Sequence, residues 1–217
     1  LARSRGLGDV YKRQVLIFRK DLDPIFKEHL RIGTSSLRRQ MQAKHHLNAS
    51  NIVSLNGNVT TRLKKLEDGI CDCIILAEAG LRRLDLINKE LNFIRLQHYT
   101  NFAQGTLAVQ WKTESEHVRE MWSGAMREMK EKYNLDMSTY DINRTKEIKT
   151  GHQLLKELNA DCNTAIPIEV KCDESSTDIV GEIYGRNRYI YFYANKVSDA
   201  IKTIKEKGGL ELLNEHN

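Results

Sequence analysis

Short apolar runs alternate with helical patterns along the first half of the chain, and this alternation limits the possible folds more than any other feature. Strands that alternate with helices indicate an α/β fold built on a parallel sheet. The apolar runs occupy residues 15–18, 51–56, 71–79 and 106–111, and helical patterns are expected at 23–30, 36–46, 60–68, 81–91 and 114–132. Gly57 and Gly69 frame the third helix, with Thr60 or Thr61 as its expected N-cap.

The pattern changes after about Tyr133. A helical segment at 145–158 precedes three strands in series, at 165–172, 178–185 and 188–194, with turn residues between them. A last helix follows from 196 to 207 and ends at a glycine pair. Sequential strands with short connections predict a small α+β domain with a three-stranded antiparallel sheet.

Residues 1–14 do not share the patterning of the rest of the 217-residue chain. They begin with Leu1 and hold four Lys or Arg against one Asp, so they carry +3 of the formal net charge of +5. The near-neutral remainder is a poor match for a nucleic-acid partner. We expect residues 1–14 to be a non-native leader resembling translated adaptor sequence, with a natural basic tail as the alternative. No secretory signal and no apolar run long enough to span a membrane is seen.

The chain has four cysteines, and their spacing says little about metal binding. Cys71 and Cys73 flank one residue in an apolar run, so we expect them to share a strand face in the core. A metal pair is conceivable, but no second pair stands at zinc spacing, and no metal site is expected. Without a secretory signal, reduced thiols in a cytosol-like compartment are the default.

Arginines follow three strand-to-helix junctions, at "GTSS", "GNVTT" and "EAG". Cations at a helix start oppose the helix dipole by roughly 0.3–1 kcal/mol each. In a parallel sheet these junctions share the carboxyl edge, where helix-start N–H groups and guanidinium groups bind anions. A multiply charged anion among them would explain the pattern. At any single junction, chance placement in an Arg-rich chain is an equal explanation. The junction arginines are Arg38, Arg39, Arg62, Arg82 and Arg83, whereas Lys64, Lys65, His45 and His46 are interpreted as surface residues.

The same segments carry a family resemblance. "GTSSLRRQ", "GNVTTRLKKLEDG" and "IILAEAGLRRLDL" resemble, in order and spacing, motifs of the porphobilinogen deaminase (hydroxymethylbilane synthase) family. "FAQGTLAVQ" (102–110) is similar to the family's return strand into its first domain, and "LNADCNTAIPIEV" (158–170) to its cofactor loop. The resemblance runs from about Val15 to the C-terminus and is strongest across 33–86.

This resemblance implies a fold and an activity. The family has a two-domain α/β body like the type II periplasmic binding proteins, and a third α+β domain. Residues 15–100 would be the second domain, 101–132 the return strand and helix of a truncated first domain, and 133–217 the third. The family joins four porphobilinogen molecules into hydroxymethylbilane and releases ammonia, on a dipyrromethane cofactor. That cofactor would be bound through a thioether to Cys162, with Ser36, Arg38, Arg39 and Arg62 as cofactor contacts and Arg62 and Arg83 as substrate contacts.

Several positions depart from the family pattern. Asn56 replaces an arginine, Ala160-Asp161 a glycine pair, Gly151-His152 an acidic-basic pair and Gln110 a glutamate. The family's catalytic aspartate has no counterpart, so we expect the second and third domains of a deaminase, inactive alone; a divergent paralogue remains open. Cys162 taken alone would be interpreted as a small core residue, but its polar loop suits a reactive thiol better.

The resemblance also implies a cytoplasmic monomer without a nucleic-acid or membrane partner, or a plastid protein if a transit peptide precedes the chain. Two alternative functions stay open. One is a nucleic-acid binder, against which stand the near-neutral body and the lack of aromatic residues among the basic ones. The other is a non-enzymatic module like a periplasmic binding protein that binds a small polycarboxylate. It would use the same arginine-lined edge but need no special cysteine. A covalent adduct on Cys162 separates this module from the deaminase.

Overall fold

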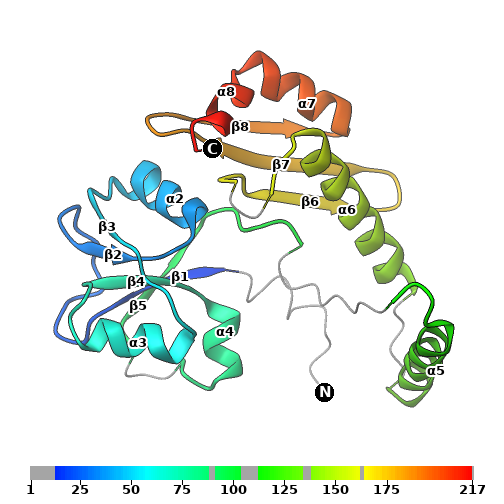
Figure 1. Cartoon of the computed structure of the whole chain (residues 1–217), viewed down its shortest axis with the longest axis horizontal. Coiled ribbons are helices and arrows are strands. Elements are labelled where there is room, and N and C mark those ends of the chain that lie inside the picture. The colour runs from blue at the N-terminus through cyan, green and yellow to red at the C-terminus, as the bar shows by residue number, and fades with distance from the viewer. Residues whose placement is uncertain (1–12, 88–90, 104–111, 134–137, 162–163, 217) are drawn as a thin grey trace.

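The computed structural model describes residues 13–87, 91–103, 112–133, 138–161 and 164–216. It contains a five-stranded sheet with flanking helices, a separate three-stranded sheet under its own helices, and one helix that stands apart from both (Figure 1). The expected mixed α/β and α+β organisation is therefore present.

The larger sheet has the strand order β3-β2-β4-β1-β5. Its strands are β1 (Gln14–Phe18), β2 (Arg31–Gly33), β3 (Asn51–Val53), β4 (Cys73–Ala77) and β5 (Phe93–Leu96). β2 pairs in parallel with β3 and β4, as expected, but β1 is antiparallel to both β4 and β5. The prediction of a wholly parallel sheet is wrong for β1, because segment 23–30 forms turns rather than a helix and β1 takes its direction from two later strands.

β1 also begins before the boundary that the sequence suggested at Val15. Gln14 is its first residue and is only 2% exposed, and the carbonyl of Arg13 accepts a hydrogen bond from the Glu78 backbone. Gln14 is therefore part of the fold and was wrongly included in the leader that we expected to be unpacked. Residues 1–12 lie outside the described part of the chain.

Helices α2 (Leu37–Leu47) and α3 (Val59–Glu67) begin just after parallel strands. The N-cap of α3 is Asn58, whose side chain accepts from the Thr61 N–H at 2.8 Å, so the expected Thr60 or Thr61 cap is wrong. Gly57 precedes it with φ +124°, a conformation that glycine adopts at no steric cost. Gly69, with φ +75°, follows the end of α3 as predicted.

Helix α4 (Glu78–Arg83) differs from its prediction. It begins before Gly80 instead of after it and is only six residues long. Asp85, two residues beyond its end, takes a left-handed conformation with φ +52°. Arg82 and Arg83 thus lie in the last turn of a helix, not at a helix start, and there the helix dipole favours cations.

The larger sheet is covered on both faces by apolar clusters. Alternate residues of β1 and β4 enter opposite clusters, with Leu16 and Ile75 in one and Ile17 and Ile74 in the other. Cys71 and Cys73 are both buried free thiols, as expected, and burial raises their pKa values to about 11 and about 12. They enter opposite clusters rather than sharing a face, because the chain bends at Asp72, before β4 begins.

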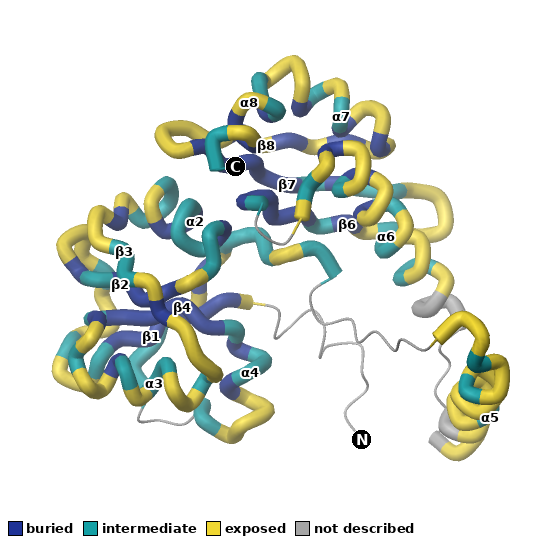
Figure 2. Tube along the Cα trace, in the orientation of Figure 1, coloured by how far each residue is buried: buried dark blue, intermediate teal, exposed yellow. Residues whose placement is uncertain are grey.

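The smaller sheet confirms the predicted three antiparallel strands in series. They are β6 (Ile168–Cys172), β7 (Thr177–Tyr184) and β8 (Tyr189–Ala194). Helices α6 (Ser138–Glu157), α7 (Val197–Glu206) and α8 (Gly209–Asn214) supply the other half of its core. β8 alternates strictly: its tyrosines are exposed while Ile190, Phe192 and Ala194 are buried, and Figure 2 shows the dark buried strands under the helices.

Helix α5 (Glu116–Tyr133) is the element that stands away from both sheets in Figure 1. The expected strand at 106–111 lies outside the described residues. None of the described helices is both long enough and apolar enough to cross a lipid bilayer.

Candidate functional site: an arginine-lined cavity between the two sheets

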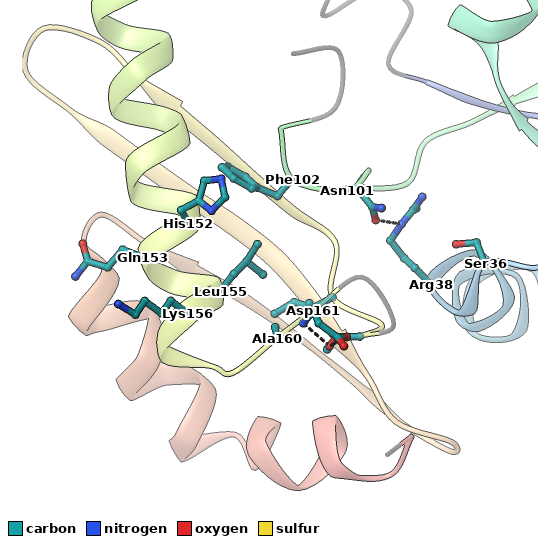
Figure 3. Close-up of a pocket in the computed structure, with 12 residues that line it drawn as sticks. Ser36, Arg38, Asn101, Phe102, His152, Gln153, Leu155, Lys156, Ala160 and Asp161 are labelled. Atoms are coloured by element: carbon teal, nitrogen blue, oxygen red, sulfur yellow. Dashed lines mark hydrogen bonds between the residues drawn. The ribbon is translucent and has the colours of Figure 1, made fainter. Parts of the chain in front are cut away.

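A cavity of about 760 Å³ lies between the start of α2 and the α6–β6 region (Figure 3). Ligand pockets commonly have volumes of roughly 300–1,000 Å³. The wall contributed by the larger domain includes Ser36 and Arg38, and the opposite wall comes from α6 and the loop before β6. Its lining residues are Ser36, Arg38, Asn101, Phe102, His152, Gln153, Leu155, Lys156, Ala160, Asp161, Thr164 and Ile166.

The first turn of α2 has features that favour anion binding. Ser36 is its N-cap but makes no side-chain capping bond, so the N–H groups of residues 37–39 have no partner within the helix. No acidic residue lies in this turn. The N-terminal end of the dipole and the free N–H groups therefore both favour a bound carboxylate or phosphate.

Arg38 is 5% exposed and is held by neutral groups. Its Nε donates to the Asn101 side-chain oxygen, and its Nη1 donates to Gln42 Oε1 at 2.7 Å and to the Tyr99 carbonyl at 3.2 Å. Burial, with a smaller contribution from the neighbouring Arg39, lowers the pKa of this guanidinium to about 10. The group stays charged at neutral pH in surroundings that oppose its charge.

Arg39 repeats this arrangement on the next residue. Its Nε donates to Gln14 Oε1 at 2.9 Å and its Nη1 to the Ile75 carbonyl at 3.0 Å. Burial, with a contribution from Arg62, lowers its pKa to about 10. In the described part of the chain, neither Arg38 nor Arg39 pairs with a carboxylate, and their Nη2 groups donate to no protein acceptor. Two adjacent cations therefore lie without a counter-charge among the described residues, which makes them candidates for binding an anion.

Arg62 lies near this pair but is exposed. Its Nε donates to the Gly57 carbonyl at 2.7 Å, and its Nη2 lies 3.5 Å from the Ser35 hydroxyl on the strand-to-helix turn before α2. Lys65, interpreted from the sequence as part of a solvated face, donates to the Asn56 carbonyl at 3.0 Å. A lysine therefore stands next to the position where the family resemblance calls for an arginine.

Arg83 is not brought to the cavity by any contact among the described residues. It is exposed at the end of α4, and its neighbour Arg82 binds the buried Glu78 at 2.8 Å. Arg95 contacts the same carboxylate at 2.9 Å. The third junction thus contains an internal carboxylate that pairs with two arginines, unlike the first. Whether Arg83 meets a substrate stays a prediction.

Cys162 lies outside the described residues, but its loop can be followed on both sides. Ala160, Asp161 and Thr164 line the cavity, and the Asp161 N–H donates to the Thr164 hydroxyl at 2.9 Å. The left-handed conformation in this turn belongs to Asn159, with φ +51°. Asparagine tolerates it, so neither Ala160 nor Asp161 needs the conformational freedom of the glycine pair they replace.

Gly151 and Phe102 form a part of the cavity that sequence reasoning missed. A Cβ on Gly151 would lie 2.0 Å from the Phe102 ring, so only glycine allows that ring to pack on α6. His152 meets the same ring edge-on, with centroids 5.5 Å apart. The sequence marked Gly151-His152 only as a departure, because the contact joins residues 49 positions apart.

The neutral partners of the arginines were also missed. Gln14, Gln42 and Asn101 supply the side-chain oxygens that hold Arg38 and Arg39. Gln42 stands four residues after Arg38 on α2, a spacing that the sequence does show. Gln14 and Asn101 come from distant segments, and no local pattern indicates them.

His45 and His46 are not simple surface residues, contrary to the sequence interpretation. Both are half-buried against the smaller sheet: His45 stacks on Tyr184, and His46 Nε2 lies 2.8 Å from the Tyr184 hydroxyl. The last turn of α2 therefore joins the two domains, and its first turn faces the cavity.

The fold and this candidate site define a class: an α/β domain with two buried arginines at the start of a helix, joined to a small α+β domain. The family model "Porphobilinogen deaminase, dipyromethane cofactor binding domain" matches residues 9–120. The chain belongs to the porphobilinogen deaminase family.

Several curated relatives agree with this assignment. A probable porphobilinogen deaminase of Methanocaldococcus jannaschii is 39% identical over 105 residues, covering 48% of this chain and 36% of that protein. The porphobilinogen deaminase of Syntrophotalea carbinolica is 30% identical over 152 residues (70% and 44%), and that of Streptococcus sanguinis 33% over 177 residues (76% and 53%). The chain spans about a third to a half of the length of these relatives.

Proposed function

We propose that this chain is the cofactor- and substrate-binding part of a hydroxymethylbilane synthase, which condenses four porphobilinogen molecules and releases ammonia. One observation carries the proposal: Arg38, which has no carboxylate partner among the described residues, lines a cavity whose far wall includes Ala160, Asp161 and Thr164, on either side of Cys162. Pyrroles with acetate and propionate side chains are polycarboxylates. Guanidinium groups bind such carboxylates in bidentate fashion.

The described residues fit a dipyrromethane cofactor. Arg38, Arg39 and the first turn of α2 would bind its carboxylates, with the free Ser36 hydroxyl and Arg62 beside them. When bound, this group supplies the terminal pyrrole onto which porphobilinogen units are added. The apolar side chains of Phe102, Leu155 and Ile166 offer surfaces for pyrrole rings.

We propose Cys162 as the attachment point. The other three cysteines suit the role less well: Cys71 and Cys73 are fully buried with raised pKa values, and Cys172 lies on β6 with its sulfur beside the Thr177 hydroxyl. A thioether needs an accessible thiolate, and burial in apolar surroundings disfavours one. Ala160 and Asp161 place the start of the Cys162 loop at the cavity.

The finer expectations remain proposals of the same kind. We propose that the larger sheet belongs to a domain of the type II periplasmic-binding-protein kind, with its ligand at the edge where β2, β3 and β4 lead into helices. We also propose a cytoplasmic monomer that acts on small molecules, without nucleic-acid or membrane partners.

Porphobilinogen binding to the 217-residue chain tests the anion site. Calorimetry should give an affinity that falls about 100-fold in Arg38→Met and in Arg39→Met, because each removes a charged hydrogen-bond donor worth roughly 1.5–3 kcal/mol. Arg119→Met is the matched control, since the Arg119 guanidinium pairs with Glu116 on the distant helix α5. Unchanged binding in both site variants would overturn the proposed site.

Intact-mass measurement tests the attachment. Joined to a complete first domain in a host that makes porphobilinogen, the chain should gain the mass of a dipyrromethane, and Cys162→Ser should not. An adduct on another cysteine refutes the assignment. Porphobilinogen binding with no adduct at all would instead support the non-enzymatic polycarboxylate-binding module.

The 217-residue chain alone should form no hydroxymethylbilane above the uncatalysed background. Loss of ammonia from porphobilinogen develops positive charge, which a positioned carboxylate must stabilise. Asp161 is the acidic side chain that lines the cavity in the described residues, and Thr164 already donates to it at 3.0 Å. If turnover is observed, Asp161→Asn is the variant that identifies the catalytic acid.

A further inference from the structure

A buried carboxylate lies between the two domains and takes no part in the proposed function. Glu182 on β7 is 6% exposed and faces the last turn of α2. The Tyr184 hydroxyl donates to its Oε2, and His46 Nε2 lies 3.3 Å from its Oε1. A buried charge is retained only where other groups pair with it.

The groups around Glu182 keep it ionised. Burial raises its pKa, but hydrogen bonds from His46 and Tyr184 outweigh that effect, so the pKa is lowered overall. The Tyr184 hydroxyl keeps its proton, because burial and the adjacent carboxylate raise its pKa. His98 stacks on His46 with centroids 4.9 Å apart, and burial lowers its pKa to about 4.

This cluster is continuous with the anion site through a single face of α2. Arg38, Gln42 and His46 are spaced four residues apart, so they form one stripe along the helix. The Gln42 side chain lies near enough to the Tyr184 hydroxyl to oppose the rise in its pKa, and Gln42 Oε1 accepts from Arg38 Nη1 at 2.7 Å. A chain of polar contacts thus leads from Glu182 in one domain to Arg38 in the other.

We infer that Glu182 and Tyr184 are positioning residues of the anion site: from the smaller domain, they hold Gln42 and His46 so that Arg38 stays directed at the cavity. Neither residue touches the cavity itself, and both act through the polar stripe of α2. The inference rests on the proposed function only for the identity of the ligand.

The first test needs no ligand. In the NMR spectrum of the isotope-labelled 217-residue chain, the Nε–H of Arg38 should give a resolved signal protected from exchange, because it donates to Asn101. Tyr184→Phe should shift this signal and speed its exchange at least tenfold, and Glu182→Gln should do so to a smaller extent. Tyr193→Phe is the matched control, because its hydroxyl binds Asp178 at the exposed end of β8.

The second test uses porphobilinogen as the probe. Its affinity should fall about tenfold in Tyr184→Phe, which corresponds to the loss of one hydrogen bond in a charged network. If the wild-type chain binds no porphobilinogen, the proposed function fails and the Arg38 signal still decides the inference. If Tyr184→Phe fails to fold, Glu182→Gln carries both tests. A lower melting temperature with an unmoved Arg38 signal would overturn the positioning role.

Discussion

Two pairs of adjacent arginines follow strands of the same sheet, and they have opposite environments. Arg38 and Arg39 are held by amide and carbonyl oxygens and have no carboxylate partner in the described structure. Arg82 binds Glu78, which is 1% exposed and also pairs with Arg95. The two pairs look alike in sequence, yet the described residues give Arg38 and Arg39 no counter-charge, whereas Arg82 has one within the protein.

The difference shows how a binding cation can be told from a structural one. A carboxylate partner stabilises the fold and neutralises the guanidinium charge, so the arginine attracts an external anion less strongly. Neutral partners orient the guanidinium without cancelling its charge, so the charge stays available to a ligand. The cavity beside Arg38 then gives that ligand room.

The largest effect should come from removing the internal counter-charge. Glu78→Gln is expected to lower the free energy of unfolding by about 3 kcal/mol, because the buried carboxylate that accepts four hydrogen bonds from Arg82 and Arg95 loses its charge. Arg38→Met should change it by less than about 1 kcal/mol, since Gln42 and the Tyr99 carbonyl keep other partners. Urea denaturation measures both. Equal losses in the two variants would contradict the distinction between the pairs.

Acid should weaken the contact between the domains before it affects either arginine pair. His98 has a pKa of about 4 in the folded chain, below its ordinary 6.5. The folded state therefore binds fewer protons between these values. The contribution of neutral His98 to the free energy of unfolding is therefore complete above pH 6.5. It declines as the pH falls to 4, by at most about 3 kcal/mol.

The groups that face His98 are His46 and Arg38 on α2 and Glu182 on β7. Because the pKa of Glu182 is lowered, its contribution is also lost on acidification, but below its ordinary value of 4.5. His98→Leu should flatten the curve of unfolding free energy against pH between 6.5 and 4. A slope that persists in this variant would assign the effect to other groups.

Adding a carboxylate partner within the protein should make the Arg38–Arg39 pair resemble Arg82, which already has one, and should weaken ligand binding. Gln14→Glu places a carboxylate on Arg39, whose Nε already donates to Gln14 Oε1 at 2.9 Å. The affinity for porphobilinogen should fall about tenfold, because the new carboxylate competes with the ligand. Gln97→Glu adds the same charge at an exposed site and is the control. Equal affinities in the two variants would show that Arg39 does not bind the ligand.

The smallest effect concerns the packing of the cavity wall. Gly151→Ala should lower the free energy of unfolding by about 1 kcal/mol, since displacing the Phe102 ring outweighs the gain in helix propensity. Gly124→Ala on α5 has no neighbour within 4 Å and should be neutral or stabilising. If Gly151→Ala raised the free energy of unfolding as much as Gly124→Ala, the Phe102 ring would be able to move aside without a loss of stability.

Much of the fold was predictable where the information is local. The apolar runs located β1, β4 and the strands of the smaller sheet, and the alternation in "YIYFYA" identified the buried face of β8. The direction of β1 was not predictable, because its five consecutive buried residues have no periodicity that indicates a partner. The end of α4 at Arg83 depends on a left-handed residue, Asp85, which the sequence does not specify.

For the site, the sequence by itself determined the motifs, the family resemblance and the arginines at the strand-to-helix junctions. Only the tertiary structure decided which of these arginines lacks a counter-charge. Glu78 reaches Arg82 within one helical turn, whereas, apart from Gln42 on the same helix, the oxygens around Arg38 and Arg39 come from β1, β4 and the segment after β5. Charge compensation depends on distances in space, and residues far apart in sequence set those distances only after the chain has folded.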